Sequence, residues 1–168
     1  VQNAITPEFA ADLAGNMAPA DVALLDSDSA AAMMGSMGAE TAVSAMDQDS
    51  LASMIGVMDA ETISQALDGE AAGAIASALT GDNLGSLGAD QAAGMANAMD
   101  AGQISDLTSD QANGMASAIA DDPSQMEQME SGSVAAMAAT MDAEDLGVLG
   151  SEMVGTMVAS MDSDQVQD

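Results

Sequence analysis

The chain has 168 residues, of which 28 are Asp or Glu and none is Lys, Arg, His or Cys, so its formal net charge is −28. These absences exclude Ser-His-Asp triads, cysteine nucleophiles, lysine Schiff bases and zinc sites built from His or Cys, and we expect no enzymatic activity. They also argue against direct nucleic-acid binding, which needs cationic contacts to phosphate. No apolar run has the length of a membrane-spanning helix, so we expect no transmembrane segment.

An apolar anchor residue precedes each predicted helix in chain order. The anchors are Ile5, Met17, Leu25, Met37, Met46, Met58, Leu67, Leu79, Leu87, Met99, Leu107, Ile119, Met129, Met141, Leu149 and Met161. Their spacing alternates between 12 residues and 8 to 10 residues. Self-similarity at such a period is the signature of a repeat architecture. We therefore expect long helical units that start near residues 5, 25, 46, 67, 87, 107, 129 and 149.

The long units share a helical pattern. The eighth residue after the anchor is always large and apolar, namely Leu13, Met33, Met54, Ile75, Met95, Met115, Met137 and Met157. An Ala, Leu or Val stands three places before it, and the next anchor stands four places after it. This spacing marks one face of an α-helix of about ten residues.

The short units predict a second, shorter helix. Most carry an apolar residue five places after the anchor (Val22, Ile63, Leu84, Ile104 and Leu146), whereas Val43 and Met126 are displaced by one or two places. The sequence therefore predicts an all-α fold. We expect a right-handed α-solenoid of about eight two-helix repeats of 20 to 22 residues, forming a single segment over residues 1–168.

Most of the acidic residues lie one or three places after an anchor, at the N-cap and the second position of the predicted helices. A carboxylate there accepts free backbone N–H groups and meets the positive end of the helix dipole. We expect no cofactor, but the same pairs are alternatively oxygen ligands for Ca²⁺ or Mg²⁺. The candidate metal ligands are Asp26, Asp28, Asp47, Asp49, Asp59, Glu61, Asp68, Glu70, Asp142, Glu144, Asp162 and Asp164.

Methionine is the commonest large apolar residue, with 17 copies, most of them at anchor or eighth positions. Pairs four residues apart, such as Met54 and Met58, could present two thioethers to Cu(I). Ile75 and Leu79 hold the equivalent positions without sulfur. Core packing by a flexible side chain explains all these positions together.

Two stretches, Met58-Asp-Ala-Glu-Thr-Ile and Leu67-Asp-Gly-Glu-Ala-Ala-Gly-Ala-Ile, show the helix-opening pattern that recurs over most of the chain. The pattern resembles the N-terminal superhelical domain of the MgtE magnesium transporter. It is also similar to the armadillo-like repeats of the flagellar switch protein FliG. The resemblance implies a superhelix of short helices. In the transporter, acidic residues of that domain help to sense Mg²⁺, so it also implies cation sensing as an alternative.

Three functions fit the sequence. The first is an acidic, secreted structural or interaction protein, either a segment of a longer array or a subunit that stacks head to tail into a filament or matrix. The second is a Ca²⁺- or Mg²⁺-binding or sensing module. The third is an anionic mimic of nucleic acid that blocks a basic partner. The sequence favours the first, with the chain itself or another protein as partner.

The composition also leads to expectations about where the protein is located and how it assembles. Without Lys or Arg the chain has no trypsin-type cleavage site, which suits an extracellular, cell-surface or periplasmic protein, and its acidity suits high salt. The residues expected to mediate self-association are Val1, Ile5, Phe9, Met161 and Val166. Met161 would stand 12 positions ahead of Ile5 in a second copy, so the repeat could continue across a subunit boundary. The alternative is a monomer in which residues 162–168 form a polar cap.

Overall fold

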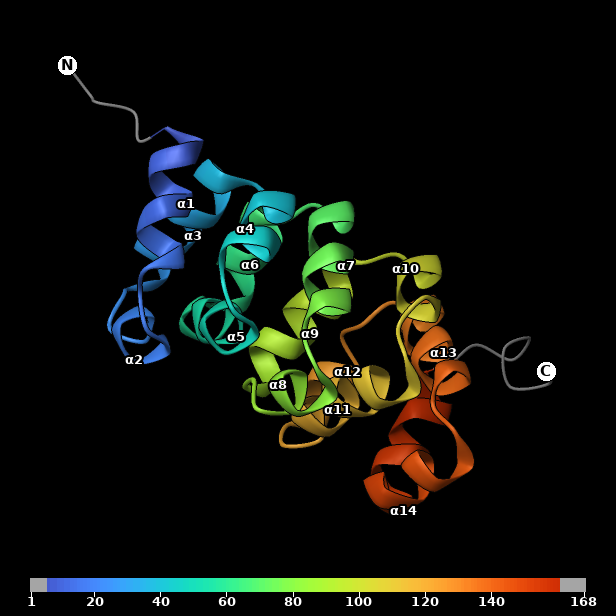
Figure 1. Ribbon diagram of the computed structural model, residues 1–168. Helices are drawn as coiled ribbons and strands as arrows, with labels where there is room; N and C mark the ends of the chain where they lie inside the picture. Colours follow the sequence, from blue (N-terminus) through green and yellow to red (C-terminus); the bar gives the residue numbers. More distant parts are fainter. Residues whose placement is uncertain (1–5, 161–168) are drawn as a thin grey trace.

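The computed structural model describes residues 6–160, and this part of the chain consists of α-helices joined by short turns, without a β-strand (Figure 1). The longer helices are α1 (Pro7–Gly15), α3 (Ser27–Met37), α5 (Gln48–Val57), α7 (Gly69–Ala78), α9 (Ala89–Ala98), α11 (Ser109–Ile119) and α13 (Ser131–Thr140). The shorter helices between them are α2 (Pro19–Val22), α4 (Ala39–Ala45), α6 (Ala60–Ala66), α8 (Gly81–Gly85), α10 (Ala101–Ser105) and α12 (Pro123–Met126). The last described helix is α14 (Ala143–Ser160).

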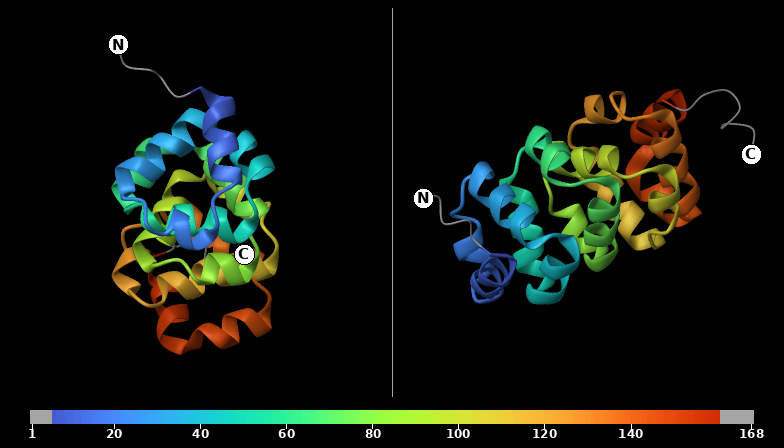
Figure 2. Two further views of the ribbon diagram at one scale, coloured as in Figure 1. Left: turned by 60° about the vertical axis from the view of Figure 1, so that its left-hand side comes forward. Right: turned by 90° about the horizontal axis from the view of Figure 1, so that it is seen from above.

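Each helix packs against the helix three places further along the chain. Helix α1 contacts α4, α2 contacts α5, α3 contacts α6, and the relation continues without a gap to α11 and α14. Because longer and shorter helices alternate up to α13, this relation places a longer helix on a shorter one over most of the chain. The helices follow one another from the first to the last, and α1 and α14 lie at opposite ends of the molecule (Figures 1 and 2).

The core runs along the whole row of helices and is built from Met, Leu, Ile and Ala. Of the residues at the eighth position of the long units, Met33, Met54, Ile75, Met95, Met115, Met137 and Met157 are buried. In the shorter helices Val22, Ile63, Leu84, Ile104 and Met126 are fully buried, whereas Leu146, which lies in α14, is half-buried. The methionines at these helix-face positions therefore pack in the core.

Two predicted core positions are wrong. Leu13 is 44% exposed, because α1 turns Ala10 and Ala14 toward its neighbours α3 and α4 instead. The backbone of Ala45 reaches Gly15 so closely that a side chain on that face of α1 would collide with it. In α4 the fully buried residue is Ala42 and Val43 is only half-buried, so a small residue again occupies the position of closest contact.

The chain also departs from the predicted boundary near residue 149. Residues 143–160 form one continuous helix, α14, where the spacing predicts a short helix and a new long one. The cap position there is Gly150, which has no side-chain oxygen, but α9 begins after Gly88 at the equivalent place, so the missing cap does not by itself explain the continuous helix. In a continuous helix the N–H groups of the next turn are instead satisfied by backbone carbonyls.

Candidate functional site

The acidic residues proposed as metal ligands lie at helix N-termini. Asp26, Asp47, Asp59, Asp68 and Asp142 each accept a backbone N–H from the residue three places on, at 2.8, 2.8, 2.8, 2.9 and 3.0 Å. Their companions Asp28, Asp49, Glu61, Glu70 and Glu144 occupy the second position of the same helices. Asp162 and Asp164 lie outside the described residues. Each described pair therefore stabilises the start of a helix.

Three helix-capping aspartates, Asp26, Asp59 and Asp122, have a pKa below the ordinary value. Hydrogen bonds from the hydroxyl and backbone N–H of Ser29 lower the pKa of Asp26. Those from the backbone and side chain of Thr62 lower the pKa of Asp59, and those from Ser124 lower that of Asp122. All three carboxylates are exposed, so the cause is hydrogen bonding to the charged form.

The candidate ligands are not gathered into a metal centre in the described part of the chain. Within residues 6–160, no group of three or more Asp or Glu side chains is placed to hold one metal ion. Instead, several acids accept bonds from neutral residues of a neighbouring helix. Asn83 donates to Asp49 at 3.0 Å, Gln125 donates to Asp90 at 2.7 Å, and Ser27 donates to Asp59 at 3.3 Å.

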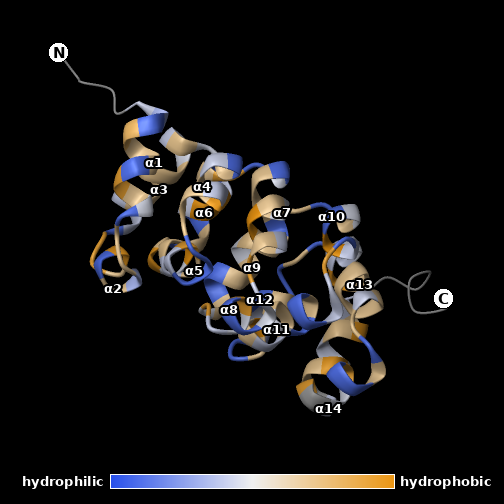
Figure 3. Ribbon diagram, viewed as in Figure 1, coloured by the Kyte–Doolittle hydropathy of each residue, from blue (hydrophilic) through white to orange (hydrophobic). Residues whose placement is uncertain are grey.

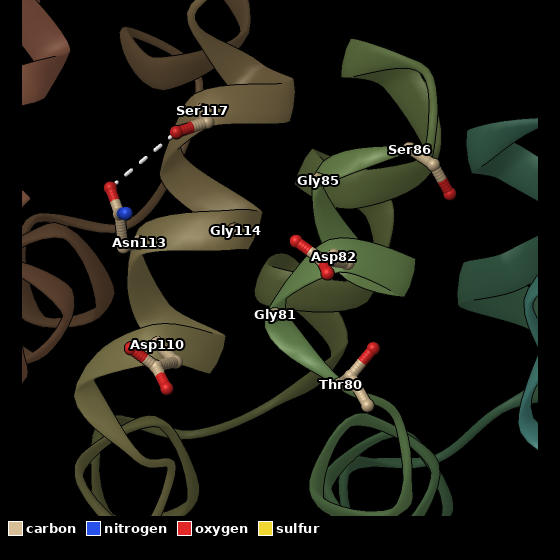
Figure 4. A pocket seen from close by; sticks show the side chains of 9 residues that line it. All are labelled: Thr80, Gly81, Asp82, Gly85, Ser86, Asp110, Asn113, Gly114 and Ser117. Atoms are coloured by element: carbon tan, nitrogen blue, oxygen red, sulfur yellow. Dashed lines mark hydrogen bonds between the residues drawn. The ribbon is translucent and has the colours of Figure 1, made fainter.

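Two carboxylates on facing helices border one hollow. It measures about 630 Å³ and is lined by Thr80, Gly81, Asp82, Gly85, Ser86, Asp110, Asn113, Gly114 and Ser117 of α8, α11 and the turns beside α8. Figure 4 shows Asp82 on α8 and Asp110 on α11, on opposite sides of the hollow. The backbones of Gly81 and Gly114 touch beneath it, so the hollow is the space above a close contact between two helices.

At two helix C-termini, glutamine amides donate hydrogen bonds in the place of basic side chains. Sequence reasoning did not predict these bonds. Gln48 donates to the carbonyl of Ala78 at 2.7 Å, and Gln91 donates to that of Met58 at 3.0 Å. The buried Gln111 donates to the carbonyl of Leu79 at 2.7 Å. These carbonyls end helices α7 and α5, where Lys or Arg commonly binds. The three glutamines lie in the first turns of α5, α9 and α11, and this recurring position is the signal that could have identified them.

The two ends of the row carry the exposed apolar side chains. Of the side chains that the structure describes, the large hydrophobic ones that are exposed are Phe9 (60%), Leu13 (44%), Leu24 (84%) and Val158 (46%). The first three lie on α1 or directly after α2, and Val158 lies on α14. Figure 3 shows hydrophobic colour in the turn beside α2, at the outer edge of the molecule. Val1, Ile5, Met161 and Val166, the other residues predicted to mediate self-association, lie outside the described residues.

None of the helices described over residues 6–160 is both long and apolar enough to cross a membrane. Comparison of the chain with models of protein families, with curated proteins and with solved structures gave no match. The all-helical structure agrees with a helical repeat, and no relative supports membership of the MgtE or FliG families.

Proposed function

We propose that this chain is a structural repeat protein, a right-handed α-solenoid of two-helix repeats that associates end to end with further copies of itself. The contact between each helix and the one three places on supports a solenoid, because the same relation repeats from α1 to α14. In such an architecture each unit covers its predecessor, and the terminal units need a cap or a neighbour.

The observation that carries the proposal is the position of the exposed apolar side chains. Phe9, Leu13 and Leu24 lie at one end of the row and Val158 at the other, with none between them among the described side chains. Exposed apolar side chains that gather at one place on a protein surface often belong to an interaction site. Two different surfaces at opposite ends make a head-to-tail contact, which propagates into a filament unless it closes.

Electrostatics sets the conditions for this association. With a net charge of −28 and no cationic side chain, two copies repel one another on every face. Salt reduces the reach of this repulsion to about 10 Å at 0.1 M ionic strength. We expect the apolar ends to associate once the repulsion is screened, which suits an extracellular or cell-surface protein of a high-salt environment.

Divalent-cation binding is the second candidate function. Asp82 and Asp110 favour it, because they border one hollow from two helices with no positive charge nearby. Carboxylate oxygens are suitable ligands for Ca²⁺ and Mg²⁺. Two carboxylates would leave most of the coordination to water, so we expect weak binding.

The substitution Phe9→Asp tests the end-to-end proposal by placing a charge in the exposed apolar surface of α1. The matched control is Ala101→Asp, which adds the same charge at an exposed position of α10, a helix that carries none of the exposed large apolar side chains. Light scattering over a series of NaCl concentrations should show particle mass rising with salt for the wild type and the control but not for Phe9→Asp. Monomers of wild-type protein at every salt concentration would overturn the proposal.

A further inference from the structure

The opposite end of the molecule contains a hollow that could receive α1. It measures about 660 Å³ and is lined by Glu127, after α12, and by Ser151, Gly155, Thr156, Ala159 and Ser160 of α14. We propose that this hollow is the acceptor surface for the α1 end of a second copy, whose Phe9 and Leu13 insert into it. This proposal rests on the proposed self-association.

The exposed face of α14 that borders the hollow has room for bulky side chains. Gly147, Ser151, Gly155 and Ala159 follow one another at intervals of four residues, and all four are exposed. Residues four apart lie on the same face of a helix. A Cβ atom added at Gly147 or Gly155 would meet nothing within 4 Å. Val158, 46% exposed, adds an apolar side chain to the same helix.

Contacts inside the row show how such faces are covered. On α9, Gly94 lies against Ala60 of α6, and a Cβ atom at Gly94 would stand 3.1 Å from the Cα of Ala60. Gly81 of α8 and Gly114 of α11 touch through their backbones. Each of these pairs joins helices three places apart. Helix α14 has such a neighbour in α11, three places before it, and it also contacts α12 and α13. Ser151, Gly155 and Ala159 nevertheless remain exposed beside the hollow.

A second copy is the occupant that fits, because α1 has the complementary deficiency. It packs against α3 and α4 on one side. Phe9 and Leu13 are four residues apart, so they project from one face of α1, and both are exposed. Large side chains without a cover at one end therefore correspond to a hollow lined by small ones at the other.

The dependence of binding on salt distinguishes a second copy from a basic partner protein. Glu8 and Asp12 flank Phe9 on α1, and Glu127 borders the hollow, so a contact between copies brings negative charges together. Such a contact strengthens as salt screens the repulsion, whereas a contact with a basic partner weakens. Association of the purified chain that increases with salt is therefore the behaviour expected of a second copy.

The direct test fills the hollow and leaves α1 unchanged. Gly155→Leu should reduce the association constant of the full chain at high salt at least tenfold, measured by sedimentation velocity. The matched control is Gly56→Leu on α5, another exposed helical glycine with nothing within 4 Å of an added Cβ atom, which should associate as the wild type does. Far-UV circular dichroism confirms that both variants retain the wild-type helical content.

Mixing two variants tests the direction of the contact. A Phe9→Asp copy keeps an intact hollow, and a Gly155→Leu copy keeps an intact α1, so an equimolar mixture should form dimers and nothing larger. Each variant alone should remain monomeric.

The acceptor surface is disproved if Gly155→Leu associates like the wild type, or if the mixture stays monomeric while the wild type associates. If Phe9→Asp abolishes association and Gly155→Leu does not, end-to-end assembly stands and only the assignment of the hollow falls. If the wild type never associates, both proposals fall.

Discussion

At the scale of single residues, the chain handles its helix ends without any positive charge. Side-chain oxygens of Asp and Thr accept the free N–H groups at most helix starts, and glutamine amides donate to carbonyls at helix ends. Short helices need such bonds, because isolated helices below about 12 residues are marginal in water. The same residues that give the protein its charge therefore hold its helices together.

Thr108 illustrates the energetic value of one cap. Its hydroxyl accepts the N–H of Gln111 at 3.3 Å, and the Gln111 side chain accepts the N–H of Thr108 at 2.9 Å. We expect Thr108→Ala to lower the free energy of unfolding by about 1 kcal/mol, measured by urea denaturation. Thr108→Ser keeps a hydroxyl and should restore most of the loss. Equal stabilities of the Ala and Ser variants would contradict a capping role.

The lowered pKa of Asp59 predicts a pH dependence. Because its folded pKa lies below its unfolded value, its contribution to stability is present above the unfolded pKa of about 4 and is lost as pH falls through the folded pKa. Asp59→Asn keeps a cap but does not titrate. The difference in unfolding free energy between wild type and Asp59→Asn should be constant from pH 7 to pH 5 and should change below about pH 4. A difference that is the same at pH 3 and pH 7 would refute this assignment.

At the scale of helices, small residues decide how closely neighbours approach. Glycine and alanine occupy the contacts between helices three places apart, notably Gly94 with Ala60 and Gly114 with Gly81. A glycine inside a helix costs up to about 1 kcal/mol relative to alanine. At the contact between Gly114 and Gly81 glycine is needed, because an added Cβ atom would collide with the backbone of the neighbouring helix.

Replacing glycine by alanine should therefore change the stability of the protein in opposite directions at two helical positions. Gly114→Ala places a Cβ atom against the carbonyl of Gly81 in α8 and should destabilise the protein by about 1–3 kcal/mol. Gly35→Ala on α3 meets nothing within 4 Å and should stabilise it by about 0.5–1 kcal/mol. Thermal denaturation of the two variants measures both effects. A stabilising Gly114→Ala would show that α8 and α11 are not in backbone contact.

Periodicity predicts the all-helical structure, because anchors and caps are local signals. It also predicts most buried side chains, such as Met54, Ile75 and Met95. It misplaces Leu13, because the exposure of that side chain depends on which face of α1 the neighbouring helices cover. It also misplaces the helix start near residue 149, where residues 143–160 form one continuous helix. For the candidate site, sequence reasoning identifies Phe9 but neither Leu24 nor the hollow on α14, since both depend on what other helices leave uncovered.

At the scale of the whole molecule, a net charge of −28 opposes every compact or associated state. We expect the melting temperature to rise with ionic strength. If Asp82 and Asp110 bind a divalent cation, Mg²⁺ or Ca²⁺ should raise it further than Na⁺ at matched ionic strength. Asp110→Asn should remove that extra increase. Equal melting temperatures in all matched salts would leave screening as the whole effect and would exclude a specific cation site.

The central claim is that copies join through their ends, and small-angle X-ray scattering across a salt series tests it most directly. End-to-end association lengthens the particle, so mass and maximum dimension should rise together while the radius of gyration of the cross-section stays at the value of the monomer. Lateral association would enlarge the cross-section as mass increases. A growing cross-section, or a mass that stays at that of one chain in every salt, would contradict the account.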